Sequence, residues 1–347
     1  MTGVPPFEIG GQTIAPGSRQ TIRFPVSVLS DHTPVAMPVH VVHGRRPGPT
    51  LFVSAAVHGD EIIGVEIVRR LLKRASLSGL RGTLLAVPIV NSYGFVNHSR
   101  YLPDRRDLNR SFPGSPEGSL ASRLADLFLQ EVVLRSDVGV DLHSAAVHRT
   151  NLPQIRVSPS REDTMELAEA FGAPLILTSK IRPGSLREAA RDNGIDVLIF
   201  EGGESLRFDE FAARVGVSGI LRVMHKLEMI TGRGVGRARV PSIKSTGSAW
   251  MRAPAGGLLR TFRSIGDEVQ AGETLGIISD PFGEVEHEIN AEQAGLLISR
   301  TNLPVVNEGD ALFHIAKIKQ SEDAGATIDH LTAQLDADPL FDEDEII

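Results

Sequence analysis

The chain has 347 residues, of which 41% are hydrophobic and 23% are charged, and its formal net charge is -7. This balance is typical of a globular protein with a core large enough for two domains, and no apolar run approaches the roughly 18 residues of a transmembrane helix. Cysteine is absent, which excludes disulfides, thiolate nucleophiles and cysteine-bound metals, so histidine and carboxylate groups would have to hold any metal.

The first 34 residues are expected to form a β-rich N-terminal extension, and residues 35–232 to form an α/β domain. From about residue 50, apolar runs alternate with amphipathic segments, which is typical of an α/β fold with a largely parallel sheet. The predicted strands cover 50–57, 82–90, 137–143 and 195–201, and the predicted helices cover 61–75, 117–134 and 161–172.

The composition changes at "TGRGVGRARVPS", residues 231–242. This segment is rich in Gly and Arg and predicts a domain boundary. Short β-like runs separated by Gly then predict a small all-β barrel or sandwich over residues 241–318. Nine acidic residues and no Lys or Arg follow Lys319, so residues 320–347 are expected to form an acidic, flexible tail.

The first predicted strand ends in a cluster of ionisable groups. His58 lies at its C-terminal end, where open α/β sheets bind their ligands, and Glu61 lies in the predicted first turn of the next helix. Residues three apart across such a turn can bind one ion, and imidazole nitrogen with carboxylate oxygen suits Zn²⁺. About one such pair is expected by chance among eleven histidines, so the pair alone is weak evidence.

His40 and His43 are also three residues apart. Their segment is predicted to be a strand, in which an odd separation places side chains on opposite faces. We therefore do not expect these two to share a metal.

Two further strand ends carry suitable groups. His143 ends the strand "DVGVDLH", and Asp141 lies on the same face, either as a ligand or as an acceptor that orients the His143 ring. His58, Glu61 and His143 would give three ligands and one open position, which is typical of catalytic zinc. Glu201 ends the strand "IDVLIFE" and is the predicted general base and acid, with Glu204 as the second choice.

The segment "NHSRYLPDRRDLNRSFPGS", residues 97–115, is predicted to be a surface loop near the site. Its Arg100, Asn109 and Arg110 have the chemistry to polarise a carbonyl and to bind a carboxylate. A solvated arginine-rich loop is the alternative interpretation.

The motifs "HGDE", "DLNRSFPG", "DLH" and "EGGE" occur in the order and at the separations of the succinylglutamate desuccinylase/aspartoacylase family, which the chain resembles. The resemblance covers about residues 35–318. It implies a zinc carboxypeptidase-like α/β/α sandwich with a mixed sheet, followed by a small β domain. Residues 253–276 also resemble biotinyl and lipoyl barrel-sandwich domains, but the lysine that carries their cofactor has no counterpart.

By resemblance, His58, Glu61 and His143 are ligands of one Zn²⁺ per chain, and Glu201 is the acid and base. The resemblance further implies that Arg100 polarises the scissile carbonyl and that Asn109 and Arg110 bind the substrate carboxylate. Asp107 and Asp141 are supporting residues. A further carboxylate-binding arginine of the family corresponds to Arg149, Arg156 or Arg182.

The sequence thus predicts a cytoplasmic zinc-dependent enzyme that hydrolyses the amide bond of a small N-acyl amino acid. An acetylated aspartate or diaminobutyrate and a succinylated glutamate are equally open as substrates. A zinc carboxypeptidase acting on peptides and a non-enzymatic biotinyl-like binding module are the alternatives. Neither a nucleic acid nor a membrane is an expected partner, and a homo-oligomer is left open.

Overall fold

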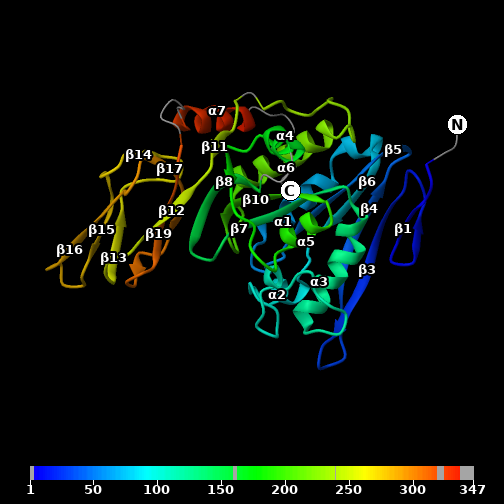
Figure 1. The fold of residues 1–347 in the computed structure, drawn as a ribbon, viewed down its shortest axis with the longest axis horizontal. Coiled ribbons are helices and arrows are strands. Elements are labelled where there is room, and N and C mark those ends of the chain that lie inside the picture. The colour runs from blue at the N-terminus through cyan, green and yellow to red at the C-terminus, as the bar shows by residue number, and fades with distance from the viewer. Residues whose placement is uncertain (1–3, 159–161, 239, 319–323, 337–347) are drawn as a thin grey trace.

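The structure is a computed structural model that describes residues 4–158, 162–238, 240–318 and 324–336 (Figure 1). One large sheet runs through the molecule, with the strand order β12-β19-β17-β8-β10-β7-β5-β6-β4-β3. The strands β9, β11 and β14 also belong to this sheet but lie outside that order. The predicted metal ligands and the predicted general base lie on the middle strands of this sheet or just after them.

The middle strands are β5 (Arg46–Ala55), β6 (Arg81–Val87), β7 (Val138–Ala145) and β10 (Asp196–Glu204), and they pair in parallel. They correspond to the four predicted strands. Every residue of β7 is buried, as expected for a strand covered on both faces.

The flanking strands run antiparallel to their neighbours, so the sheet is mixed. They are β3 (Arg19–Val28), β4 (Pro34–His43) and β8 (Arg149–Val157), while β9 (Leu175–Thr178) pairs with β8 in parallel. The mixed sheet implied by the family resemblance is confirmed, and the parallel arrangement predicted from the alternation holds for the centre. The hairpin of β1 (Phe7–Ile9) and β2 (Gln12–Ile14) precedes β3.

Helices cover both faces of the sheet. One face packs against α1 (Ile63–Leu72), α4 (Glu162–Phe171) and α6 (Glu210–Lys226), and the other against α3 (Leu120–Glu131) and α5 (Leu186–Asp192). The short elements are α2 (Ser92–Val96), η1 (Ala75–Gly79), η2 (Leu108–Arg110) and η3 (Val133–Arg135). Gly64 lets α1 lie close to β5, because a Cβ there would be 2.7 Å from the Cβ of Ala55.

The C-terminal segment is built from strands: β11 (Ile243–Ser245), β12 (Ser248–Arg252), β13 (Gly257–Thr261), β14 (Glu268–Val269), β15 (Thr274–Ser279), β16 (Glu286–Asn290), β17 (Gly295–Thr301), β18 (Val305–Val306) and β19 (Ala311–Ala316). A four-stranded sheet, β16-β15-β13-β18, shares an apolar core with strands of the large sheet. Since β17 pairs with β8, hydrogen bonds join this segment to the α/β part, and Figure 1 shows it at one end of the molecule.

Part of the tail expected to be flexible is a helix, α7 (Ala324–Asp336). Its Leu331 and Leu335 are buried against the same core as α1 and α6, and this burial stabilises the helix. Residues 337–347 lie outside the described part. None of the described helices is long and apolar enough to cross a membrane.

Candidate active site

The loop after β5 carries the first two site residues. Gly59 lies against the backbone of α2, because a Cβ on it would be 1.9 Å from the carbonyl carbon of Gly94. Only glycine fits such an approach, so Gly59 sets the path of the chain between His58 and Glu61. The prediction that Glu61 lies in the first helical turn was wrong, because α1 begins at Ile63 and Glu61 precedes it.

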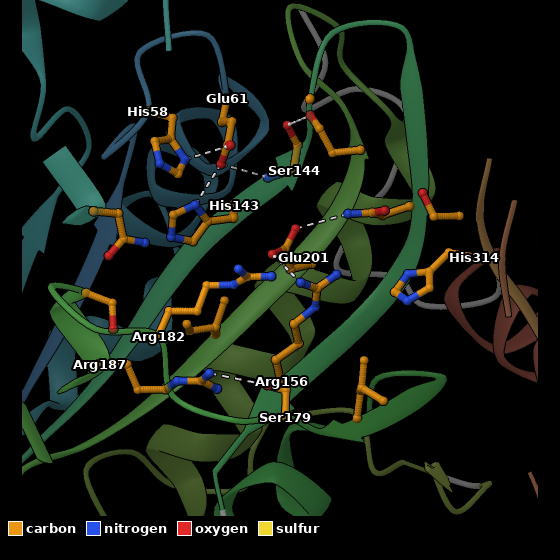
Figure 2. Close-up of a pocket in the computed structure, with 18 of the residues that line it drawn as sticks. His58, Glu61, His143, Ser144, Arg156, Ser179, Arg182, Arg187, Glu201 and His314 are labelled. Atoms are coloured by element: carbon orange, nitrogen blue, oxygen red, sulfur yellow. Dashed lines mark hydrogen bonds and ion pairs between the residues drawn. The ribbon is translucent and has the colours of Figure 1, made fainter. Parts of the chain in front are cut away.

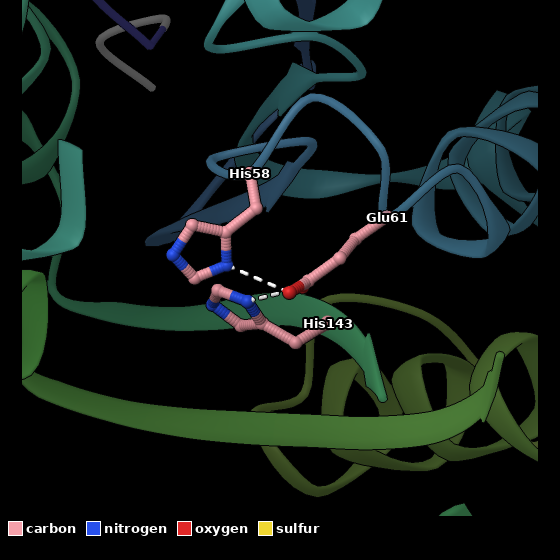
Figure 3. A group of neighbouring side chains, drawn as sticks. All are labelled: His58, Glu61 and His143. Carbon is pink, nitrogen blue, oxygen red and sulfur yellow. Dashed lines mark hydrogen bonds and ion pairs between the residues drawn. The ribbon is translucent and has the colours of Figure 1, made fainter. Parts of the chain in front are cut away.

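His58, Glu61 and His143 meet at the carboxyl ends of β5 and β7 (Figure 3). The Nδ1 atom of His58 lies 2.7 Å from Glu61 Oε1, and the Nδ1 atom of His143 lies 2.7 Å from Glu61 Oε2. All three residues are buried, with exposed fractions of 4%, 3% and 4%. One ligand atom from each lies within 4.8 Å of the other two, so the three can hold one metal ion.

A carboxylate holds the outer nitrogen of each imidazole. His58 Nε2 lies 3.0 Å from Asp107 Oδ1, and His143 Nε2 lies 2.7 Å from Asp141 Oδ2. Ser54 Oγ donates to the other oxygen of Asp141 at 2.7 Å. Histidines that bind metals are commonly oriented in this way, with the free nitrogen aimed at the ion. The residues present therefore fit a divalent metal, with Asp141 in the orienting position.

The electrostatics of the cluster favour a cation. Burial opposes a charge on Glu61, but the imidazoles of His58 and His143 outweigh it and hold the pKa of Glu61 well below its usual range. Burial likewise opposes protonation of His143, but Asp141 and Glu61 raise its pKa well above the ordinary value. The anionic carboxylates thus favour positive charge on the two imidazoles. A bound metal would supply positive charge at the same place.

Glu201 lies beside His143 on the neighbouring strand, because the two are paired residues of β10 and β7. Its Oε2 accepts a hydrogen bond from Asn151 Nδ2 at 3.0 Å, and its Oε1 lies 3.3 Å from Arg156 Nη1. Glu201 lines the cavity described below. Glu204 instead accepts hydrogen bonds from His148 N and Asn302 Nδ2, away from that lining.

The loop over residues 97–115 brings its polar side chains to the cluster. Arg100 Nη1 lies 3.2 Å from Glu61 Oε1, and its Nη2 donates to Asp107 Oδ2 at 2.9 Å. Asn109 Oδ1 accepts from the backbone N–H of Leu186 at 2.9 Å, which fixes the amide at the start of α5. Arg110 lines the cavity near them.

The two histidines that were not expected to share a metal lie apart from this cluster. His40 Nδ1 lies 2.8 Å from Thr21 Oγ1, whereas His43 is buried and its Nδ1 lies 2.9 Å from Thr83 Oγ1. Both are on β4, as predicted.

A cavity of about 740 Å³ opens beside the cluster (Figure 2). Its lining holds two carboxylates, Glu61 and Glu201, and seven cationic side chains: Arg100, Arg110, Arg149, Arg156, Lys180, Arg182 and Arg187. Clefts lined by one sign of charge attract ligands of the opposite sign, so this cavity favours an anion.

Arg187 was missed by the sequence analysis, which considered only Arg149, Arg156 and Arg182. It is buried, and among the described residues its Nε and Nη1 have no hydrogen-bond partner. Burial and the charge of Arg156 lower its pKa to about 10. The signal in the sequence was "SLRE", residues 185–188, because Ser followed by Glu three residues later marks a helix start and places Arg187 in the first turn.

The far wall of the cavity comes from the C-terminal strands, and the sequence did not indicate it either. His314 of β19 and Trp250 of β12 stack with ring centroids 4.5 Å apart, and the Arg149 guanidinium lies 5.3 Å from the Trp250 ring. Ser248 and Ser299 also line this wall.

The fold and the cavity together define an α/β enzyme with a cluster of two histidines and one glutamate that could hold a metal. Residues 47–227 match the model of the succinylglutamate desuccinylase/aspartoacylase catalytic domain, and the chain belongs to this family.

Individual relatives agree with this assignment. The chain is 30% identical to N-alpha-acetyl-L-2,4-diaminobutyric acid deacetylase of Halomonas elongata, over 83% of this chain and 87% of that one. A crystal structure of succinylglutamate desuccinylase/aspartoacylase from Rhodobacter sphaeroides has a TM-score of 0.76 at 28% identity, covering 87% of this chain and 96% of that one. The product-bound ectoine utilization protein EutE (DoeB) from Ruegeria pomeroyi shares the fold, with a TM-score of 0.77 at 24% identity and coverage of 86% and 94%.

Proposed function

We propose that the protein is a zinc-dependent amidohydrolase that removes the acyl group from a small N-acyl amino acid in the cytoplasm. The observation that carries the proposal is the meeting of two imidazole Nδ1 atoms with Glu61, next to Glu201 and inside a cationic cavity. The activities named for the relatives support it, since both the desuccinylase and the diaminobutyrate deacetylase cleave acyl groups from amino acids.

His58, Glu61 and His143 would hold the metal, and Asp107 and Asp141 would orient the two imidazoles. Zinc is the ion we propose, because imidazole nitrogen and carboxylate oxygen are its preferred ligands when cysteine is absent. Bound there, it would polarise the scissile carbonyl and lower the pKa of water.

Glu201 is the proton carrier in this proposal. Its carboxylate would take a proton from the attacking water and later deliver it to the leaving nitrogen, so that a neutral amine departs. Asn151 donates a hydrogen bond to one oxygen of Glu201 and Arg156 lies 3.3 Å from the other, so these two residues orient the carboxylate.

Arginines bind and polarise the substrate. Arg100 lies against Glu61 and Asp107 at the edge of the cluster, where its guanidinium can stabilise negative charge that develops on the carbonyl oxygen. Asn109 and Arg110 would bind the substrate carboxylate, and the buried Arg187 is a further candidate because two of its nitrogen atoms have no described partner.

A substrate screen tests the proposal. The purified protein is first analysed for bound metal, and release of free amine is then measured with acetyl- and succinyl-amino acids and with short peptides. We expect about one zinc per chain and hydrolysis of the N-acyl amino acids. Faster cleavage of peptides would favour the carboxypeptidase alternative, and a metal-loaded protein that releases no amine from any of them would contradict the proposal.

A further inference from the structure

An apolar pocket of about 280 Å³ shares no lining residue with the active-site cavity. It is lined by Ile62, Val65, Phe95, His98, Leu206 and Phe208. Phe208 is 67% exposed, and Val96, the neighbour of Phe95, is 75% exposed. Neighbouring exposed apolar side chains mark surfaces that bind another chain segment or a partner. The pocket is smaller than the roughly 300 to 1,000 Å³ of small-molecule sites and suits a pair of side chains.

The pocket adjoins the loop that carries His58 and Glu61. Ile62 follows Glu61 directly. The backbone N–H of Leu206, another lining residue, donates a hydrogen bond to the carbonyl oxygen of Asp60 at 2.9 Å. A segment that fills the pocket would therefore restrict the motion of this loop, and slower hydrogen exchange of the Leu206 amide would report it.

The end of α7 lies near this pocket. Arg214 Nη1 donates to Leu335 O at 3.3 Å, and Arg214 Nε donates to Glu210 Oε1 at 2.8 Å. One guanidinium joins the two, so Leu335 O is within about 10 Å of the Glu210 carboxylate. Phe208 precedes Glu210 by two residues, which is at most about 7 Å of backbone. The helix α6 packs against both α7 and α1, as Figure 1 shows.

The chain continues past α7 with "ADPLFDEDEII", residues 337–347. This segment contains an apolar pair, Leu340 and Phe341, followed by four consecutive acids. The six residues from Leu335 to Phe341 can extend to about 20 Å, which is enough to bring the apolar pair to the pocket. The acids would then lie beside Arg207, which stands between two lining residues and has a side chain that is 71% exposed. Apolar and charged groups of the segment thus match the pocket and its rim.

We propose that residues 337–347 bind to this pocket of the same chain, with Leu340 and Phe341 packed against Phe95 and Phe208. Burial of the two apolar side chains stabilises the bound state, and the charge of the following acids fixes its direction. Because the segment is tethered a few residues from the pocket, its effective concentration there is about millimolar, far above that of a second copy in dilute solution. The bound segment would support the loop of the active site without lining its cavity.

Disulfide cross-linking in the full chain tests this contact. The chain has no cysteine, so the pair Arg207→Cys with Asp342→Cys can form one defined disulfide. The control pair is Arg237→Cys with Asp342→Cys, because Arg237 is exposed, its carbonyl oxygen accepts from Gln334 Nε2 of α7, and it does not line the pocket. We expect the disulfide with position 207 to form within one chain and at least about tenfold faster than the disulfide with position 237.

Variants of the segment and of the pocket test the apolar side chains. Leu340→Ser with Phe341→Ser, and separately Phe208→Ser, should each slow the disulfide between positions 207 and 342 by about tenfold. Phe208 is 67% exposed, so its replacement leaves the core intact. In the chain without introduced cysteines, Leu340→Ser with Phe341→Ser should also speed exchange of the Leu206 amide several-fold, because a filled pocket protects its hydrogen bond.

Two controls remove apolar side chains without touching the proposed contact. Ile346→Ser with Ile347→Ser changes the other apolar pair of the same segment. Phe282→Ser changes a residue that is 83% exposed and does not line the pocket. Both controls should leave the rate of the disulfide between positions 207 and 342 unchanged.

Three outcomes would overturn the proposal. A disulfide between two chains, with a yield that rises with protein concentration, would show that a second copy covers the pocket. Equal rates with positions 207 and 237 would show that the segment has no preferred site. A rate that Leu340→Ser with Phe341→Ser leaves unchanged, or that Ile346→Ser with Ile347→Ser slows instead, would refute the assigned contact. None of these measurements uses amide hydrolysis, so their result is independent of the proposed function.

Discussion

Replacing Glu201 by Gln tests the assignment of the proton carrier. The amide is nearly the same size as the carboxylate and keeps an oxygen for the hydrogen bond from Asn151 Nδ2, but it cannot take up a proton from water. General acid and base catalysis contributes about 10²- to 10⁴-fold, so we expect kcat to fall by that factor, or about 3 to 5 kcal/mol in the barrier. Metal content should stay native, because the proposed metal ligands are His58, Glu61 and His143 and do not include Glu201.

The assay combines release of amine, metal analysis and thermal unfolding of the same samples. Glu204→Gln is the matched control, because this carboxylate lies on the same strand, accepts from His148 N and Asn302 Nδ2, and is outside the cavity lining. It should retain native kcat. If Glu201→Gln keeps kcat within about threefold of native, Glu201 is not the proton carrier; a loss of metal in that variant would refute the assignment of the ligands.

Three further predictions follow from the site and its supports. Chelation of the metal should abolish activity and lower Tm. Zinc added at about a thousand times its Kd should restore about 4 kcal/mol of stability, measured by calorimetry. Equal Tm values with and without zinc would contradict the metal site. Gly59→Ala should cost about 1 to 3 kcal/mol in denaturant unfolding and reduce metal content, because its Cβ would overlap the backbone of Gly94. The hydrogen bond from Arg69 is the main cause that lowers the pKa of Glu66. The ionised carboxylate of Glu66 therefore stabilises the folded state above the ordinary pKa of the group, and this stabilisation is lost as the pH falls. Glu66→Gln should therefore flatten the fall of Tm below about pH 4.5, and an unchanged profile would count against this contribution.

The sequence was sufficient for the centre of the site. His58, His143 and Glu201 each follow a largely apolar run that predicts a strand, and parallel strands bring such ends to one edge of a sheet, which makes their convergence predictable. Asp107, Asn109 and Arg110 could be placed only through the family motif, because a polar loop has no periodicity from which its position can be inferred.

The rest of the cavity depended on pairings between distant segments. β8 was not predicted as a strand, and its pairing with β17 joins residues that no local pattern relates. His314 lies in an apolar run that reads as an ordinary core strand, so nothing in the sequence shows that its ring faces a cavity. The helix α7 was not predicted either, because its buried Leu331 and Leu335 lie within a strongly acidic stretch.

The pairing of β8 with β17 also has a consequence for the biosynthesis of the protein. The cluster of His58, Glu61 and His143 and the carboxylate of Glu201 are translated well before the strand that forms the opposite wall, so a nascent chain has these groups before it has an enclosed cavity. Until β17 emerges, the backbone of β8 at residues 149–151 has an open edge, which can pair with strands of other chains. A product truncated after the α/β part would keep that edge exposed, and aggregation would be its expected fate.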